Sequence, residues 1–297
     1  MSYTVYSMKP SAGVVLAGGR SSRMGAPKAA LDWHGSTLLR HVTGVVERAV
    51  DGPVIVVRAP GQPLPELDPK VVVADDPEEG RGPMQGLAVG LAAAARHADT
   101  AFVCSTDLPF LHAAFVQAVL RGFEPDPDAG WPEAPEVVLP FVGGFRQPMA
   151  AGYRTALASR VERLLGEGRL RPSHLFEESA VRQLDDAGLR ADPRLAAADP
   201  ALDSVVNANT PEEYAAAHGR PAPEVVVERF GVLATRGAGR GASRVRAANL
   251  AAAARQAGVP FDGHVVAAVN GDQIRGDGMW PLLAGDTVSF FSADAGG

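Results

Sequence analysis

Short apolar runs alternate with longer helical segments over the first two thirds of the chain. The runs are rich in β-branched residues and lie between glycine, proline and charged positions, as expected of strands buried on both faces of a parallel sheet. Residues 37–50 and 84–98 instead carry apolar side chains at helical spacing. This alternation predicts an α/β fold with a doubly wound, mostly parallel, Rossmann-like sheet. The predicted strands are residues 12–17, 53–58, 70–74, 101–105 and 136–139.

The last quarter of the chain follows a different pattern. Residues 220–224 contain two prolines and no apolar face, which is typical of a linker. Beyond them the pattern predicts a small α+β unit, in which Asn270-Gly271 is a hairpin-type turn. We therefore expect two domains, residues 1–219 and 225–297, joined at 220–224. In the second, strands are predicted over 224–233, 264–269 and 285–291, and a helix over 244–257.

Composition and charge narrow the class of protein. The 297 residues are 46% hydrophobic, enough to bury a core, and the formal charge of -6 makes a nucleic-acid surface unexpected. No apolar run reaches membrane-spanning length, and the N-terminus lacks the apolar centre of a signal peptide. The single cysteine, Cys104, excludes an intramolecular disulfide. We expect a cytoplasmic protein that binds neither nucleic acid nor membrane.

A glycine-rich, basic stretch follows the first predicted strand, LAGGRSSRMGAPK at residues 16–28. Gly18 and Gly19 lack a Cβ, so the backbone amides can approach a ligand closely. Arg23 and Lys28 add positive charge, which favours an anion such as phosphate. The spacing differs from the GxxxxGK[ST] of a P-loop. The alternative is a plain strand-to-helix turn with solvated basic side chains.

Asp107 follows another predicted strand, in the segment CSTDLPF at residues 104–110. A carboxylate at the carboxyl end of a strand, on the same edge as the glycine-rich stretch, is placed to hold a Mg²⁺ that bridges phosphate oxygens. The alternative for Asp107 is a helix N-cap or a turn ahead of Pro109. Asp75 ends a third strand, where a nucleoside contact and a solvated turn are both open.

The segment NANTPEE at residues 207–213 predicts a helix start. Thr210 is the expected cap, Pro211 the first helical residue and Glu213 the closing member of a capping box. Asn207 and Asn209 are not explained by this local role. The histidines offer no partner for catalysis, and we expect His41 to lie on the surface of its helix.

Together these segments resemble the nucleotidyltransferases related to the molybdenum cofactor guanylyltransferase MobA. The matching motifs are LAGGxSxRMGxxK at 16–28, an acidic residue with a Gly-Pro-x-x-Gly loop at Asp75 and 82–86, Asp-x-Pro at Asp107, and a closing NxNTP at 207–211. The resemblance implies Mg²⁺-dependent transfer of GMP from GTP to molybdopterin or molybdenum cofactor.

The resemblance also implies roles for individual residues. Arg23, Lys28 and Asp107 would be catalytic, with Asp107 holding the metal, and Asn207 and Asn209 would face the acceptor. The implied nucleotide-binding residues are Leu16, Ala17, Gly18, Gly19, Lys28, Asp75 and Asp107.

Two departures from the family pattern leave the base of the nucleotide open. Pro27 and Arg58 stand where guanylyl-transferring members carry Asp and Asn. A MocA-like cytidylyltransferase that uses CTP is therefore one alternative. A second is a sulfur carrier or scaffold whose nucleotide-binding domain is inactive.

The order of predicted elements in the last quarter resembles the β-grasp (ubiquitin-like) sulfur carriers MoaD and ThiS, which end in Gly-Gly as this chain does at Gly296 and Gly297. The resemblance implies that the terminal carboxylate is adenylated and converted to a thiocarboxylate. It also implies the partners: a MoaE-like large subunit of molybdopterin synthase, a MoeB-like E1 adenylyltransferase, and molybdoenzymes or cofactor-insertion proteins.

Overall fold

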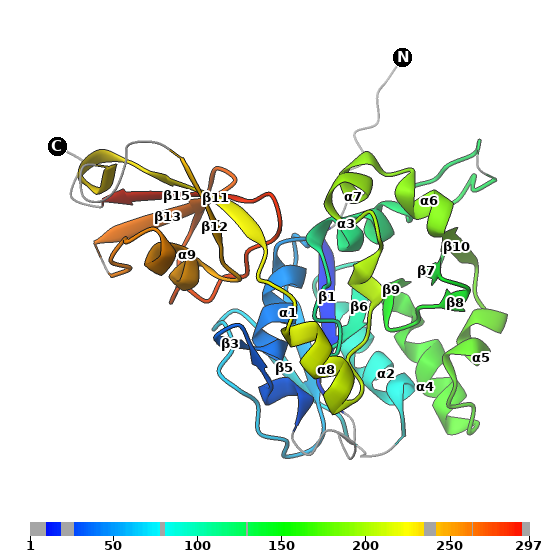
Figure 1. Ribbon diagram of the computed structural model, residues 1–297. Coiled ribbons are helices and arrows are strands. Elements are labelled where there is room, and N and C mark those ends of the chain that lie inside the picture. The colour runs from blue at the N-terminus through cyan, green and yellow to red at the C-terminus, as the bar shows by residue number, and fades with distance from the viewer. Residues whose placement is uncertain are drawn as a thin grey trace.

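The structure is a computed structural model that describes residues 10–18, 27–77, 81–128, 130–234, 242–262 and 264–292 (Figure 1). Four of the predicted site residues, Gly19, Arg23, Gly296 and Gly297, lie outside these ranges. In the part of the chain that is described, no helix combines the length and the apolar character needed to cross a membrane.

The first sheet has the strand order β10-β7-β9-β6-β1-β4-β5, with β8 paired to β7. Strand β1 lies between β4 and β6 and is parallel to both, whereas β9 is antiparallel to both of its neighbours. The predicted α/β fold with a mostly parallel sheet is confirmed. The strands are β1 Ser11–Leu16, β4 Val54–Arg58, β5 Val72–Asp75, β6 Thr100–Ser105, β7 Val137–Val142, β8 Phe145–Arg146, β9 Ala150–Arg154 and β10 Val181–Asp185.

Helices cover both faces of this sheet because successive strand residues point to opposite sides. Val15 and Val56 pack under α1, α3, α6, α7 and α8, whereas Val14 and Val57 pack under α2, α4 and α5. The helices are α1 Leu38–Glu47, α2 Pro83–Ala94, α3 Ala113–Arg121, α4 Ala158–Gly166, α5 Pro172–Glu177, α6 Asp186–Arg190, α7 Pro193–Ala198 and α8 Pro211–His218. Short elements complete this part: η1 Lys28–Ala30, β2 Asp32–Trp33, β3 Ser36–Thr37, η2 Thr155–Leu157 and η3 Asp203–Val205.

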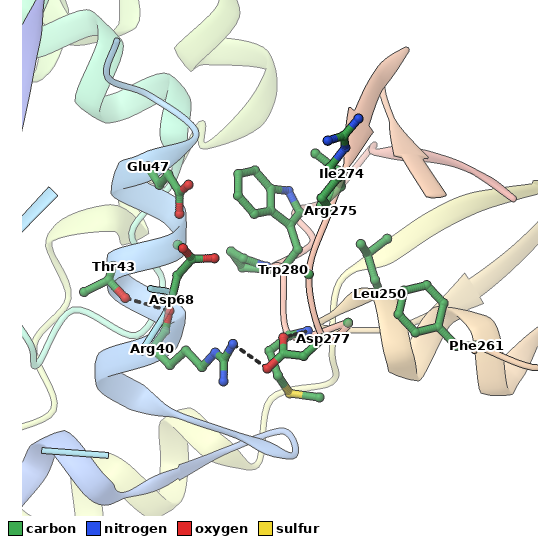
Figure 2. Close-up of a pocket in the computed structure, with 15 residues that line it drawn as sticks. Arg40, Thr43, Glu47, Asp68, Leu250, Phe261, Ile274, Arg275, Asp277 and Trp280 are labelled. Carbon is green, nitrogen blue, oxygen red and sulfur yellow. Dashed lines mark hydrogen bonds and ion pairs between the residues drawn. The ribbon is translucent and has the colours of Figure 1, made fainter. Parts of the chain in front are cut away.

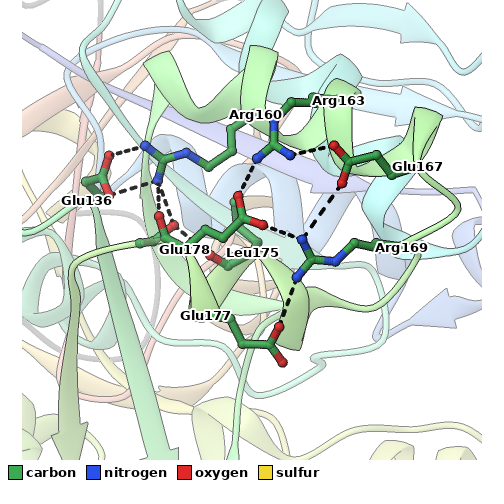
Figure 3. A network of polar contacts seen from close by, with 9 residues as sticks. Glu136, Arg160, Arg163, Glu167, Arg169, Leu175, Glu177 and Glu178 are labelled. Carbon is green, nitrogen blue, oxygen red and sulfur yellow. Dashed lines mark hydrogen bonds and ion pairs between the residues drawn. The ribbon is translucent and has the colours of Figure 1, made fainter.

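A network of ion pairs joins α4 and α5 to the residue before β7 (Figure 3). Arg160 binds both carboxylate oxygens of Glu136 at 2.9 Å, and Arg169 binds Glu177 at 2.9 Å. These side chains are partly or largely exposed, so water and salt screen the pairs and each contributes little to stability. The network holds α4 and α5 against the start of β7, and it lies apart from the site described below.

The second sheet belongs to the last quarter of the chain and has the order β12-β11-β15-β13-β14. Strands β11 and β15 pair in parallel, and the other three pairings are antiparallel. Helix α9 packs on this sheet through Leu250 and Ala253, which share a core with Val227 and Phe290. The elements are β11 Glu224–Arg229, η4 Gly231–Ala234, β12 Ser243–Arg246, α9 Leu250–Gln256, β13 Val265–Val269, β14 Asp272–Ile274 and β15 Thr287–Ser292.

The structure corrects the predicted helix over 244–257. Its first residues belong to β12, which pairs with β11, and α9 starts only at Leu250, where Asn249 accepts a hydrogen bond from the Ala252 amide at 2.8 Å. The two-residue alternation of Ser-Arg-Val-Arg was overlooked because it is only four residues long. The Asn270-Gly271 turn is confirmed: both residues have positive φ, and they join β13 to the unpredicted strand β14.

Candidate functional site

The segment after β1 runs along the carboxyl edge of the first sheet. The amides of Ala17 and Gly18 donate to the Val57 carbonyl at 2.8 and 3.2 Å, so the segment stays beside β4. A Cβ on Gly18 would lie 3.2 Å from the Ala59 amide nitrogen, closer than side chains normally approach. The neighbouring backbone thus favours glycine at position 18.

Neighbouring side chains fix the same segment from both sides. The Thr106 hydroxyl donates to the Leu16 carbonyl at 3.0 Å. The Gln62 side-chain amide donates to the Ala17 carbonyl and accepts from the Ala59 amide, both at 3.0 Å. Sequence reasoning missed Gln62, because its role depends on a loop after β4 that carries no motif.

Three of the predicted site residues meet at this edge. The Lys28 ammonium donates to Asp107 Oδ2 and to Asn209 Oδ1, both at 2.9 Å, and the Ser105 hydroxyl donates to the other oxygen of Asp107. The side chains of Lys28 and Asp107 are 21% and 15% exposed, so their ion pair is partly shielded from water. The cluster combines a cation, a carboxylate and an amide at the end of β6.

The chain before α8 is held against the Asp107 loop. The Ala208 amide donates to the Asp107 carbonyl at 2.9 Å, which brings Asn209 to Lys28. Glu213 accepts from the amides of Asn209 and Thr210 at 2.7 and 3.2 Å, and the predicted capping box of Thr210 and Glu213 is confirmed. Asn207 lies apart, exposed, with its side chain donating to the Val205 carbonyl at 3.3 Å.

The N-cap alternative for Asp107 is wrong. His112 caps α3 instead, because its side chain accepts from the Ala114 amide at 3.0 Å. The carboxylate of Asp107 is therefore directed to Lys28 and Ser105 rather than to a helix end.

His41 is also corrected, from a surface position to a buried one. It is 7% exposed, and its Nε2 lies 3.1 Å from the Pro109 carbonyl in the Asp107 loop. Burial lowers the pKa of His41 to about 4, although the hydrogen bond to Pro109 acts the other way. His41 lies three residues after Leu38, on the apolar face of the helix, which was the signal for burial.

Asp75 lies at the same sheet edge, at the end of β5, but among the described residues it pairs with Arg58 instead of joining the Lys28 cluster. Arg58 Nε lies 2.6 Å from Asp75 Oδ1, and the two are register partners at the ends of β4 and β5. The Asp75 carboxylate is 58% exposed. Arg58, one of the departures from the family pattern, thus directly neutralises the residue implied in nucleoside contact.

Comparison with known proteins agrees with this arrangement. Residues 13–184 match the model of the MobA-like NTP transferase domain family. A probable molybdenum cofactor guanylyltransferase of Mycobacterium bovis (strain BCG / Pasteur 1173P2) is 43% identical over 173 residues, 57% of this chain and 81% of the relative. One of Mycobacterium avium (strain 104) is 39% identical over 176 residues, 58% of this chain and 84% of the relative.

A solved structure shares the fold. It is the crystal structure of molybdopterin-guanine dinucleotide biosynthesis protein A from Archaeoglobus fulgidus. The match spans 70% of this chain and 96% of the Archaeoglobus chain, with a TM-score of 0.52 and 20% sequence identity. The family match includes the edge that carries Leu16, Lys28 and Asp107 and ends before the second sheet. The protein is a nucleotidyltransferase enzyme, and the chain belongs to the family of MobA-like NTP transferases.

Proposed function

We propose that this enzyme transfers GMP from GTP to molybdopterin or molybdenum cofactor and so forms the dinucleotide cofactor. The observation that carries the proposal is the meeting of Lys28, Asp107 and Asn209 at the carboxyl edge of β1 and β6. This is the edge at which open α/β sheets bind their ligands. The names of the relatives support molybdenum cofactor as the acceptor.

In the proposed reaction, GTP lies along Leu16, Ala17 and Gly18, with Gly19 and Arg23 as further predicted contacts outside the described residues. A phosphate oxygen of the acceptor attacks the α-phosphorus, the bond between the α- and β-phosphates breaks, and pyrophosphate leaves with its electron pair. Lys28 offsets the negative charge that develops. A phosphate monoester has a second pKa of about 6, so the attacking oxygen is largely ionised at neutral pH and needs no general base.

Asp107 is the residue proposed to hold Mg²⁺. Within the described ranges, no three His, Cys, Asp or Glu side chains are grouped so that they could bind a metal together. One carboxylate suits Mg²⁺, which commonly takes one or two protein carboxylates and completes its shell with phosphate oxygens and water. The bound ion would neutralise charge on the phosphates, and Ser105 and Lys28 keep the Asp107 carboxylate in place.

The identity of the base is tested by assaying the purified enzyme with Mg²⁺, molybdenum cofactor, and either GTP or CTP. We expect turnover with GTP. Turnover with CTP alone would overturn the guanylyl assignment and favour the MocA-like alternative. The matched control is Asp107→Ala, which should lose transfer with either nucleotide; unchanged transfer in that variant would contradict the role given to Asp107.

For the last quarter of the chain we propose a β-grasp sulfur carrier at 225–297, joined by the 220–224 linker to the transferase domain at 1–219. The mixed order β12-β11-β15-β13-β14, the parallel pair β11 and β15, and the packing of α9 on this sheet support this proposal. Gly296 and Gly297 would carry the thiocarboxylate. The proposed partners are a MoaE-like synthase subunit, a MoeB-like activating enzyme, and molybdoenzymes or cofactor-insertion proteins.

The carrier proposal is tested by incubation with an E1-like activating enzyme, ATP and a sulfur donor, followed by intact-mass measurement. We expect the mass increase that corresponds to replacement of one oxygen by sulfur, and its loss when Gly296 and Gly297 are deleted. Asp107→Ala should keep this increase while losing nucleotidyl transfer. A chain that never gains the mass is not a carrier; one that gains it but never transfers a nucleotide fits the scaffold alternative.

A further inference from the structure

The two sheets are joined by a specific contact on α1. Three residues at spacings of four, along α1 and its C-cap, lie on one helix face and meet a loop of the last quarter. We call them the α1 stripe. Figure 2 shows Arg40 of this helix directed at Asp277, and the ion pair measures 2.6 Å. The α1 stripe is Arg40, Gly44 and Arg48, and it faces Asp277, Pro281 and Asp286.

Arg48 makes the strongest contact of the α1 stripe. Its guanidinium donates to both carboxylate oxygens of Asp286, at 2.7 and 2.8 Å, and to the Pro281 carbonyl at 2.9 Å. The two side chains are 11% and 6% exposed. Asp286 also accepts from the Leu283 amide and the Asn270 side chain, so the buried pair is well satisfied. Separation of the last quarter of the chain from α1 would break the Arg48–Asp286 pair and is therefore unfavourable.

Gly44 shows that the helix is shaped for the contact. Glycine inside a helix is less favourable than alanine. A Cβ at position 44 would lie 2.6 and 2.8 Å from Pro281 Cδ and Cγ, and both of these atoms belong to the last quarter of the chain. The absence of a side chain on α1 therefore serves the contact with Pro281.

We infer that the last quarter of the chain is a fixed carrier, docked on the α1 stripe in one orientation, whose C-terminal end serves a separate protein and not the nucleotide site of its own chain. The inference rests on the proposed carrier function, but docking can be measured without any activity.

The directions of the elements carry this inference. Strand β15 begins beside Asp286 and continues for six residues, about 20 Å at the usual rise. In Figure 1 its arrow leads away from the first sheet. The carboxyl end of β15 therefore lies about 20 Å from α1, on the side away from the first sheet.

The nucleotide site is farther still. Arg48 follows α1 at the amino end of β1, where the Gly52 amide donates to the Ser11 carbonyl at 2.9 Å. The Lys28 cluster lies at the opposite, carboxyl end of β1, about another 20 Å along the strand. While the α1 stripe is occupied, the carboxyl end of β15 and the nucleotide site stay apart.

Docking is tested on the full chain with nitroxide labels at Glu162→Cys on α4 and Gln256→Cys on α9, both exposed positions. The native Cys104 is fully buried and burial raises the pKa of its thiol, so labelling is selective. Electron-electron distance measurement should give one narrow distribution. A broad distribution in the unmodified background would overturn the inference and indicate a mobile carrier.

The role of the α1 stripe is tested by adding Arg40→Ala, Gly44→Leu and Arg48→Ala together. We expect the distance distribution to broaden while nucleotidyl transfer stays within twofold of the parent. Should the triple variant fail to fold, Asp277→Ala with Asp286→Asn removes both ion pairs from the other side. The matched control is Arg244→Ala, which breaks the exposed pair with Glu224 within the second sheet and should leave the distribution narrow. A narrow distribution in the folded stripe variant would show that other contacts hold the parts together.

The separation of the C-terminal end from the nucleotide site is tested by deleting residues 293–297. Nucleotidyl transfer should be unchanged, because the chain end does not reach the nucleotide site. A severalfold drop in kcat with the distance distribution unaltered would mean that the chain end does act at its own site. Absence of thiocarboxylate formation in a rigid, docked chain would instead count against the carrier proposal alone.

Discussion

At the residue scale, Lys28 is the side chain on which the proposed chemistry most depends. It bridges Asp107 and Asn209 from the first position of η1, which is also the last residue of the glycine-rich stretch. A fixed cation at this point lies where phosphate charge is expected, and a preorganised charge costs little reorganisation during reaction.

We predict that Lys28→Ala lowers kcat/KM for nucleotidyl transfer by about 100-fold or more, the usual effect of removing one preorganised charged donor. Lys70→Ala is the matched control, since Lys70 is 77% exposed and pairs with Glu47 at 3.4 Å away from the site. Steady-state kinetics with both variants measures the effect. Equal losses in the two variants would indicate a general effect of lysine removal and contradict the assigned role.

His41 couples acid stability to the position of the Asp107 loop. Its pKa of about 4 lies below the ordinary value of 6.5, so the unfolded chain takes up the proton first as pH falls. The contribution of His41 to the free energy of unfolding is therefore complete above pH 6.5, and it is lost progressively between pH 6.5 and 4. From these two values the loss between pH 7 and pH 5 amounts to about 2 kcal/mol.

We predict that His41→Phe removes this part of the pH dependence. At pH 7 the variant should be about 1–3 kcal/mol less stable, because the Pro109 carbonyl loses its partner. Urea unfolding at pH 7 and pH 5 measures both effects, with the exposed His97→Gln as control. If His41→Phe and the parent lose the same stability between the two pH values, His41 is not the group responsible.

At the scale of elements, the start of α8 serves the site as well as the fold. The capping box satisfies the first amides of the helix, and the same Glu213 carboxylate holds the Asn209 amide at 2.7 Å. The segment is also tied to the Asp107 loop through Ala208. One local motif thus fixes an asparagine that the sequence alone left without a defined neighbour.

We predict that Glu213→Ala destabilises the protein by about 1 kcal/mol, as expected for loss of a helix cap. It should also raise the KM for the molybdenum cofactor acceptor severalfold while that for GTP changes little, since Asn209 is proposed to face the acceptor. Glu213→Gln should restore most of both properties, and the exposed neighbour Glu212→Ala should show neither effect. An increase confined to the KM for GTP would move Asn209 to the nucleotide side.

At the scale of the whole molecule, α1 is shared by both parts of the chain. Its inner face packs on the first sheet through Leu38, Val42 and Val45, and its outer face binds the last quarter through the α1 stripe. Burial alone would raise the pKa of Asp286, but hydrogen bonds and charge from Arg48 outweigh it and hold that pKa below the usual range.

We predict that Asp286→Asn separates the unfolding of the two parts. Loss of one partner of a buried pair typically costs about 3–5 kcal/mol. In the parent, the lowered pKa means that the contribution of Asp286 is complete above about pH 4 and is lost as pH falls further through the folded value. Calorimetry from pH 7 to pH 3 should show this loss in the parent and not in the variant. If Asp286→Asn at pH 7 unfolds in a single thermal transition with the midpoint of the parent, the prediction that the two parts unfold separately is wrong.

Local rules account for what was predicted correctly. Five strands of the first sheet, β1, β4, β5, β6 and β7, follow from short apolar runs rich in β-branched residues. The start of α8 follows from its capping residues, and the 270–271 turn from the conformations that Asn and Gly tolerate. The position of Asp107 at a sheet edge follows from the strand before it. Each of these signals spans only a few residues, so the order of amino acids is sufficient to recognise it.

The remaining features depend on contacts between distant residues. Strand β9 contains no β-branched residue and gains its place between β6 and β7 by pairing, and β12 gains its place by pairing with β11. The Lys28 contacts with Asp107 and Asn209 join residues 79 and 181 positions apart, and the Arg48 contact with Asp286 joins residues 238 positions apart. Periodicity and motif spacing carry no information about such pairs, because burial and hydrogen bonding across the folded chain select them.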